Sequence, residues 1–297
     1  MPLFMGLDCG GSACRVLTVD EAGSVLHMGQ AGPANLASTP PARLVANLAK
    51  ATAGSPTPDR VAACFAGLLT PNDRERALGI LAGMFPKSEV IAEPDYVAVL
   101  AAGGPDIDVA VLSGTGSLVC SMAPEGPVKS GGGGYLLGDF GSEFQYGRAA
   151  LRHFLDAGES GCSASLTQSI LRVFGSLEEN QVLANLYRGG SPAAKLAKLA
   201  PAFAKDAFAG EAYALETLNL QNARLADVVR THVERWLGDR HPLRVALAGG
   251  LWEGPAIFRQ RFEVELRTAL PKTDLLIAKL PRPPVHGAVV LARRTHS

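Results

Sequence analysis

The sequence predicts an α/β protein composed of two lobes, and three observations support this. Its 297 residues are enough for two domains that each bury a core. Before Gly103-Gly104-Pro105, apolar runs of strand length and helical patterns follow in the order βββαβαβα. After it, a second series begins in the same way, although no exact repeat is visible. We therefore expect an N-terminal lobe over residues 1–106, joined by a C-terminal helix at 286–297, and a C-terminal lobe over 107–285.

The first lobe opens with three apolar runs separated by Gly, Ser and acidic residues, a pattern typical of an antiparallel meander: 3–8, 15–19 and 24–29. Thr39 is placed to cap the next helix, because Pro40-Pro41 suits a first helical turn. Apolar residues then follow at helical spacing: Leu44, Leu48 and Ala51. The remaining elements expected are a strand at 60–66, a helix begun by Pro71-Asn72-Asp73, a strand at 89–92 and a helix over 96–102.

The second lobe is predicted to add a long helical stretch to a similar set of strands. The expected strands are 108–113, 117–122, 127–130, 244–248 and 274–279. A glycine cluster lies at 131–134, and 142–238 is mostly helical. An amphipathic helix carries Phe258, Phe262, Leu266 and Leu270, and a last helix from about His286 returns to the first lobe.

Composition excludes several classes of function. Lys and Arg balance Asp and Glu at 28 each, so no global field favours nucleic acid or an anionic membrane. The N-terminal letters show no signal peptide, and there is no apolar run of about 18 residues to span a membrane. The five cysteines form no metal-binding spacing, so each is expected to be a small buried residue in a reducing cytoplasm: Cys9, Cys14, Cys64, Cys120 and Cys162.

Two glycine turns have the residues that a phosphate site needs. In the first, the strand ending at Asp8 leads through Gly10 and Gly11 to Ser12. Glycines let backbone N–H groups face an anion, the serine hydroxyl can donate a hydrogen bond, and the carboxylate can hold Mg²⁺ through its waters. The second turn, Ser113-Gly114-Thr115-Gly116-Ser117, follows its own strand in the same way. Either turn alone could be an ordinary hairpin, but the pair favours phosphate binding.

With these turns and the motifs below, the chain resembles the BadF/BadG/BcrA/BcrD-type ATPases, and within them the N-acetylglucosamine kinases. The resemblance implies the two-lobed ribonuclease H-like (actin-like ATPase) fold, in which each lobe is a mixed sheet flanked by helices and the active site lies in the interlobe cleft. It implies that the two turns are the phosphate loops. Residues 245–251 read VALAGGL and resemble the adenosine motif, so Gly249 and Gly250 would approach the nucleoside.

The family's substrate motifs also have counterparts here. Gly32-Pro33-Ala34-Asn35 resembles the Gly-Pro-x-Asn segment whose asparagine contacts sugar hydroxyls, although Asn35 could also be a simple turn residue. Glu93-Pro94-Asp95 stands where relatives carry Asn-Asp, which makes Asp95 the implied general base, with a helix cap as the alternative. Residues 131–142 resemble the Gly-Gly-Trp-Gly…Gly-Asp-Glu-Gly-Ser signature, and 284–288 resemble Pro-x-x-Gly-Ala.

The resemblance implies phosphorylation of an amino sugar by ATP and Mg²⁺, in a cytoplasmic homodimer. Asp8 would hold Mg²⁺ and Asp95 would accept the proton of the sugar hydroxyl. The other implied sugar contacts are Asn35, Thr115, Gly133, Gly134 and Asp139.

Two departures leave the sugar open. Gly133 stands where a tryptophan is usual and Phe140 replaces a glutamate, so glucosamine or a larger amino sugar remains an alternative to N-acetylglucosamine. Two other functions also stay open. One is an ATPase that activates an iron–sulfur enzyme, for which Cys120 and Cys162 are the candidate ligands, and the other is a sugar sensor without catalysis.

Overall fold

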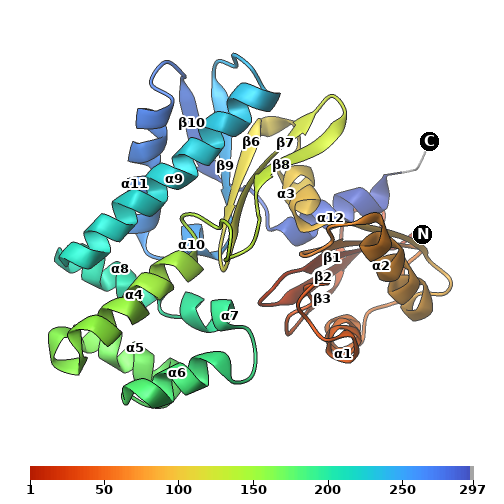
Figure 1. The fold of residues 1–297 in the computed structure, drawn as a ribbon. Helices are drawn as coiled ribbons and strands as arrows, with labels where there is room; N and C mark the ends of the chain where they lie inside the picture. Colours follow the sequence, from red (N-terminus) through yellow and green to blue (C-terminus); the bar gives the residue numbers. More distant parts are fainter. Residues whose placement is uncertain (295–297) are drawn as a thin grey trace. The chain divides into compact units, whose positions relative to one another are not determined.

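The computed structural model describes residues 1–294 and divides the chain into two compact units. The first comprises Met1–Ile107 and the chain from Leu280 on, and the second comprises Asp108–Lys279. Figure 1 shows the blue C-terminal helix α12 (Pro284–Arg293) among the elements of the N-terminal part. The predicted C-terminal helix at 286–297 thus begins two residues earlier, and positions 295–297 of that prediction lie outside the described residues.

The first unit is built on a five-stranded sheet of order β3-β2-β1-β4-β5. Its strands are β1 (Phe4–Cys9), β2 (Cys14–Val19), β3 (Val25–Ala31), β4 (Arg60–Phe65) and β5 (Glu89–Pro94). Strands β1, β2 and β3 are antiparallel neighbours, and β4 and β5 continue the sheet parallel to β1. The predicted meander and the predicted order βββαβαβα are both confirmed.

Helices cover both faces of this sheet: α1 (Pro41–Thr52), α2 (Pro71–Met84), α3 (Asp95–Gly103) and α12. Because side chains alternate along a strand, Met5 packs in the core beneath α1 and α2, whereas Phe4 packs beneath α3 and α12. The predicted cap of α1 is wrong. Pro40 occupies the N-cap position, and its side chain has no oxygen that could accept a hydrogen bond. Thr39 lies one residue before the N-cap.

The second unit repeats this topology. Read from β8, its sheet has the order β8-β7-β6-β9-β10, which corresponds strand by strand to β3-β2-β1-β4-β5. The strands are β6 (Val109–Ser113), β7 (Ser117–Ala123), β8 (Gly126–Gly131), β9 (Leu243–Ala248) and β10 (Leu275–Lys279). Strands β6, β7 and β8 are antiparallel, and β9 and β10 run parallel to β6. The duplication that the sequence pattern suggested is therefore present in the sheet order.

The predicted helical stretch lies between β8 and β9. It contains α4 (Glu143–Ala157), α5 (Ala164–Phe174), α6 (Glu179–Tyr187), α7 (Pro192–Ala197), α8 (Ala200–Ala209) and α9 (Ala212–Trp236). The unit is completed by the short α10 (Gly250–Glu253) and by α11 (Ala256–Ala269). Helices α4, α8 and α11 pack against the long helix α9, and buried apolar residues of these helices and of the sheet form one core.

Four of the five cysteines are buried free thiols, as expected. The expectation is wrong for Cys162, which is only partly buried because it lies in the loop that leads into α5. Among residues 1–294, the structure contains no helix that is both long and apolar enough to cross a membrane.

Candidate active site

In the first unit, the carboxyl ends of the parallel strands bring two predicted carboxylates to one edge of the sheet. Asp8 is the penultimate residue of β1, and Asp95 directly follows β5, with β4 between them. Strand ends at such an edge are where α/β sheets bind ligands. The two side chains influence each other. Burial raises the pKa of Asp8 to about 6, nearby Arg15 opposes this rise, and the negative charge of Asp95 adds to it.

The first predicted phosphate turn is a tight hairpin between β1 and β2. The backbone N–H of Gly10 donates to the carbonyl of Ala13 at 2.9 Å, which leaves Gly11 and Ser12 exposed at the tip. Gly10 also accepts a hydrogen bond from the N–H of Ala34 at 3.0 Å. That bond ties the segment containing Asn35 to the hairpin, so two separate predicted motifs become neighbours.

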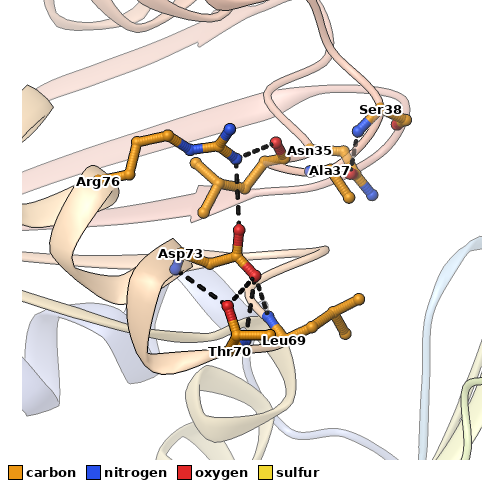
Figure 2. A network of polar contacts seen from close by, with 8 residues as sticks. Asn35, Ala37, Ser38, Leu69, Thr70, Asp73 and Arg76 are labelled. Carbon is orange, nitrogen blue, oxygen red and sulfur yellow. Dashed lines mark hydrogen bonds and ion pairs between the residues drawn. The ribbon is translucent and has the colours of Figure 1, made fainter.

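The side-chain oxygen of Asn35 forms hydrogen bonds within its own turn. Its Oδ1 accepts hydrogen bonds from the backbone N–H groups of Ala37 and Ser38, each at 2.9 Å, which agrees with the turn alternative for this residue. Figure 2 shows these contacts in the loop between β3 and α1. Gly67 packs so closely that a Cβ there would lie 2.5 Å from this Oδ1. With the carbonyl oxygen fixed by the turn, the Nδ2 group is the part of Asn35 suited to a ligand.

A network from helix α2 holds the same loop. Thr70 and Asp73 form a capping box at the start of α2, and Asp73 lies 3.6 Å from Arg76. The guanidinium of Arg76 donates to the carbonyl of Leu36 at 2.5 Å (Figure 2). The position of the loop that contains Asn35 therefore depends in part on Arg76, which no sequence motif had marked.

Asp95 is not the N-cap of its helix. Pro94 occupies that position without a side-chain hydrogen bond, and Asp95 is the first residue of α3. Its Oδ1 accepts from the N–H of the adjacent Tyr96 at 2.9 Å. Next to it, Glu93 forms a two-point ion pair with Arg74 at 2.6 and 2.9 Å. This ion pair anchors the end of β5 to α2. Asp95 is two residues farther along the chain, at the edge of the sheet where β5 ends.

In the second unit, the turn between β6 and β7 is braced by the loop that follows β8. The hydroxyl of Ser113 donates to the carbonyl of Gly141 at 2.8 Å, and that of Ser117 donates to the carbonyl of Phe140 at 2.7 Å. Both serines are buried. The turn that contains Gly114, Thr115 and Gly116 is thus held at its two ends by the signature loop.

Asp139 also supports this turn. Its Oδ1 accepts from the backbone N–H of Ser117 at 3.1 Å, and a Cβ at Gly116 would lie 2.9 Å from its other oxygen. Asp139 has the left-handed φ of 56°, which aspartate tolerates better than most residues and which turns its carboxylate toward the strand pair. Burial raises its pKa, and the bond from Ser117 opposes that rise.

The predicted adenosine motif meets the same turn. Gly249 follows β9 with φ 108°, and a Cβ there would come within 2.3 Å of the carbonyl oxygen of Ser113. Only glycine fits this approach. Gly250 begins α10, and its N–H lies 3.6 Å from the Cβ position of Gly114. The structure therefore brings together Gly114, Gly249 and Gly250, which are far apart in the sequence.

Gly133 and Gly134 lie in the exposed part of the signature loop. A Cβ added at Gly133 would make only an ordinary contact, 3.6 Å from Leu137, and Gly134 has open space around it. The tryptophan that the motif leads one to expect is thus replaced by accessible space at this position.

Three charged residues near these sites do not belong to any of the motifs identified in the sequence. Arg15 lies 3.8 Å from Asp8 across the β1–β2 pair, and Arg74 anchors Glu93. Glu143 is the first residue of α4, and its Oε1 lies 3.3 Å from the Cβ position of Gly250. Burial raises the pKa of Glu143. The antiparallel pairing of β1 with β2 could have predicted that Arg15 lies opposite Asp8. The contacts of Arg74 and Glu143 depend on tertiary packing.

The carboxylates at this edge of the sheet suit a Mg²⁺ ion that is held through its water ligands. Within residues 1–294, the structure contains no cluster of three or more His, Cys, Asp or Glu side chains placed to hold a metal ion directly. Mg²⁺ usually keeps several waters and needs only one or two carboxylates in addition to substrate phosphates. Asp8, which lies beside an exposed glycine hairpin, fits that requirement.

Two curated relatives match this chain in sequence. An N-acetyl-D-glucosamine kinase from Dictyostelium discoideum is 29% identical over 205 residues, which cover 67% of this chain and 63% of that protein. An N-acetylmuramic acid/N-acetylglucosamine kinase from Clostridium acetobutylicum is 25% identical over 187 residues, 62% of this chain and 60% of that protein. The chain thus spans less than two thirds of the length of the curated relatives that it matches.

Solved structures share the fold over the whole chain. A Chromobacterium violaceum protein solved as a candidate N-acetylglucosamine kinase is 22% identical, with a TM-score of 0.74 and 99% of each chain covered. A ROK family glucokinase from Streptomyces griseus is 17% identical, with a TM-score of 0.58 over 99% of this chain and 100% of that one.

The family model with the description BadF/BadG/BcrA/BcrD ATPase family matches residues 5–289, which include the glycine turns of both sheets and the motif at Gly249. That range is nearly the whole chain, and the same two-sheet fold recurs in the solved structures. The chain belongs to the BadF/BadG/BcrA/BcrD ATPase family.

Proposed function

We propose that this protein is an ATP-dependent kinase that phosphorylates a hydroxyl group of an amino sugar, N-acetylglucosamine or a close relative of it. The observation that carries the proposal is that the same glycine-containing hairpin occurs in two sheets of the same topology. In each, a glycine hairpin follows the first strand at the carboxyl edge, and in the first unit that edge also holds Asp8 and Asp95. Both curated relatives are named as kinases of N-acetylated amino sugars.

The phosphates of ATP would be bound by backbone N–H groups and hydroxyls rather than by a cationic field. In the first unit these would come from Gly11 and Ser12, while Gly10 shapes the turn because its own N–H donates to the carbonyl of Ala13. In the second they would come from Thr115 and Gly116, while the N–H of Gly114 closes the turn by donating to the carbonyl of Gly116. Such preorganised donors stabilise charge that develops on the transferred phosphoryl group, which is the main requirement of phosphoryl transfer.

Asp8 would hold Mg²⁺ through water ligands. The ion, when bound, neutralises phosphate charge during transfer. Gly249 and Gly250 would let the backbone approach the nucleoside, and the carboxylate of Glu143 beside Gly250 is suited to accept hydrogen bonds from ribose hydroxyls.

Asp95 would act as the general base. It precedes the rest of α3, so its charged form lies at the positive end of the helix, and Arg74 engages the neighbouring Glu93 instead. It would accept the proton of the acceptor hydroxyl as the hydroxyl oxygen bonds to the γ-phosphorus and the bond from that phosphorus to ADP breaks. The proposed sugar contacts are Asn35, through Nδ2, in the first unit, and Thr115, Gly133, Gly134 and Asp139 in the second.

An assay of ADP release tests this proposal. The purified protein with Mg·ATP is given N-acetylglucosamine, glucosamine or other amino sugars, and product formation is followed by mass spectrometry. We expect sugar-dependent ADP release for at least one of them. If no sugar stimulates release and calorimetry detects no Mg·ATP binding at millimolar concentration, the kinase proposal is wrong.

The two other functions predict different results. An activator of an iron–sulfur enzyme needs accessible thiolates at a subunit interface, yet Cys120 is fully buried in β7. Iron in anaerobically purified protein would favour that function. A sensor would bind sugar without consuming ATP. We also propose that the enzyme is a cytoplasmic homodimer, consistent with its free cysteines, and light scattering can test the dimer.

A further inference from the structure

A buried histidine of α9 links that helix to the strand that leads into the signature loop. The loop comprises residues 131–142, from the last residue of β8 to the N-cap of α4. Nδ1 of His232 lies 2.8 Å from the hydroxyl oxygen of Ser130 on β8, and its Nε2 lies 2.9 Å from that of Ser121 on β7. Ser130 directly precedes the loop, so one of the two hydrogen bonds of His232 holds the loop at its entry.

The imidazole ring of His232 has a fixed orientation. The side chain is fully buried, and burial lowers its pKa to about 4, so the ring is neutral at neutral pH. A neutral imidazole has one N–H donor and one acceptor nitrogen, so one serine accepts a hydrogen bond from the ring and the other donates one to it. Because each ring nitrogen has a partner, rotation of the ring would leave buried polar groups unsatisfied. The ring is therefore a rigid connection between α9 and the β7–β8 hairpin.

The other end of the signature loop is attached to the same face of α9. The backbone N–H of Gly141 donates to Oε1 of Gln221 at 3.2 Å. A Cβ added at Gly141 would lie 2.8 Å from Cδ2 of Leu225, so this end packs closely against the helix. Gln221 and His232 are eleven residues apart, which is about three turns, or roughly 16 Å, along a helix. The helix thus holds the entry and the exit of the loop at a fixed separation.

Between these two attachments the loop is rich in glycine. Gly131 and Gly132 have left-handed φ angles of 74° and 65°, and Gly134 has φ 80°. Glycine populates many backbone conformations, so such a stretch keeps one conformation only where its surroundings fix it. Residues 133–137 are exposed to solvent. The position of this stretch therefore depends on the anchor at Ser130.

We infer that His232 is a positioning residue for the sugar, because its bond to Ser130 sets where the backbone of Gly133 and Gly134 lies. The inference rests on the proposed function, since it takes these two glycines as sugar contacts. A binding group that is misplaced by about 1 Å contributes much less to binding or catalysis, so the residues that hold it in place matter as well. In this assignment His232 acts only through the loop.

The two anchors are expected to affect different substrates. At the exit, carbonyl groups of the loop accept hydrogen bonds from Ser113 and Ser117, the serines that brace the second phosphate turn. Gln221→Met keeps the size of the side chain and removes its acceptor, so it should raise KM for ATP as well as KM for the sugar. The entry instead leads directly into the glycines that contact the sugar, so a change at His232 or Ser130 acts chiefly on the sugar.

Two serine variants test the inference with the same chemical change. Ser130→Ala and Ser121→Ala each remove one hydroxyl from a nitrogen of His232, but only Ser130 adjoins the loop. With N-acetylglucosamine, or the amino sugar that the ADP-release assay selects in its place, KM for the sugar should rise about tenfold in Ser130→Ala, the change expected when one hydrogen bond is lost. Its kcat and KM for ATP should stay close to wild type. Ser121→Ala should keep the wild-type KM for the sugar, although urea unfolding shows a similar loss of stability in both variants.

Two substitutions of His232 separate positioning from packing. The side-chain amide of asparagine lies as far from the backbone as Nδ1, so His232→Asn keeps a partner for Ser130 and loses the one for Ser121. Glutamine reaches as far as Nε2 and does the reverse. We therefore expect His232→Gln to raise KM for the sugar about tenfold and His232→Asn to stay nearer the wild-type value. If His232 only filled space, glutamine would be the milder change, because its size is closer to that of histidine.

Several outcomes would overturn the inference while leaving the kinase intact. One is an equal KM for the sugar in Ser130→Ala and Ser121→Ala, and another is a milder effect of His232→Gln than of His232→Asn. A third is an increase in KM for ATP alone in Ser130→Ala. If the wild-type protein phosphorylates no sugar, the proposed function fails, and amide hydrogen exchange of residues 131–138 decides whether His232 positions the loop. Exchange there should be faster in Ser130→Ala than in Ser121→Ala, and equal exchange would overturn the positioning role.

Discussion

Asp8 is expected to reduce the stability of the folded protein while serving its function. Its pKa is raised from 3.8 to about 6, and its side chain is only 13% exposed. The folded state therefore binds the proton of Asp8 more tightly than the unfolded chain does. Both states are protonated at low pH, so there is no penalty below about pH 3.8. The penalty grows as pH rises and is complete above about pH 6, where the carboxylate is ionised while buried.

The magnitude follows from the size of the shift. About two pKa units correspond to roughly 3 kcal/mol of unfolding free energy at pH 8, and to about half of that at pH 5. Asp8→Asn keeps the shape and cannot ionise. We expect this variant to be more stable than the wild-type protein by up to about 3 kcal/mol at pH 8, with a smaller gain at pH 5.

Urea unfolding at pH 5 and pH 8 measures this difference, with Asp239→Asn as a control for removing an exposed carboxylate. Calorimetry should show at the same time that Asp8→Asn binds Mg·ATP more weakly than the wild-type protein. A variant that gains no stability at pH 8, or gains equally at both pH values, would refute the claim that a buried charge at Asp8 opposes folding.

Three further substitutions test other parts of the site. In Asp95→Asn, kcat should fall by about 10²- to 10⁴-fold while ATP affinity and urea stability stay close to wild type, and near-normal turnover would remove Asp95 as the base. Gly133→Trp should shift relative kcat/KM toward N-acetylglucosamine over larger amino sugars, because the added Cβ fits without strain and the ring fills the open space. An unchanged ratio in a folded variant would mean that Gly133 does not shape the pocket. Gly249→Ala should lose about 1–3 kcal/mol of stability, since its Cβ would lie 2.3 Å from the carbonyl of Ser113 at φ 108°. It should also weaken ATP binding in calorimetry, and a variant as stable as wild type would show that the β9–β6 approach can relax.

The order of elements and the two glycine turns could be predicted from the sequence alone. Strand and helix periods are local, and glycine and proline mark where the chain turns, so βββαβαβα and its repetition are visible without any tertiary contact. The same holds for the candidates Asp8 and Asp95. A polar residue at the end of a buried strand is evident in the letters, and parallel strands bring such ends to one edge.

Tertiary structure decided how these residues behave. The raised pKa of Asp8 depends on its burial and on a carboxylate from another strand, and neither can be read from neighbouring letters. Whether Asn35 offers its oxygen or its amide depends on the turn that uses Oδ1. The approach of Glu143 to Gly250 joins the starts of two helices that are far apart in the sequence. Patterns with a short period reveal secondary structure, but solvation and charge depend on which distant segments pack together, and the folded chain alone determines that.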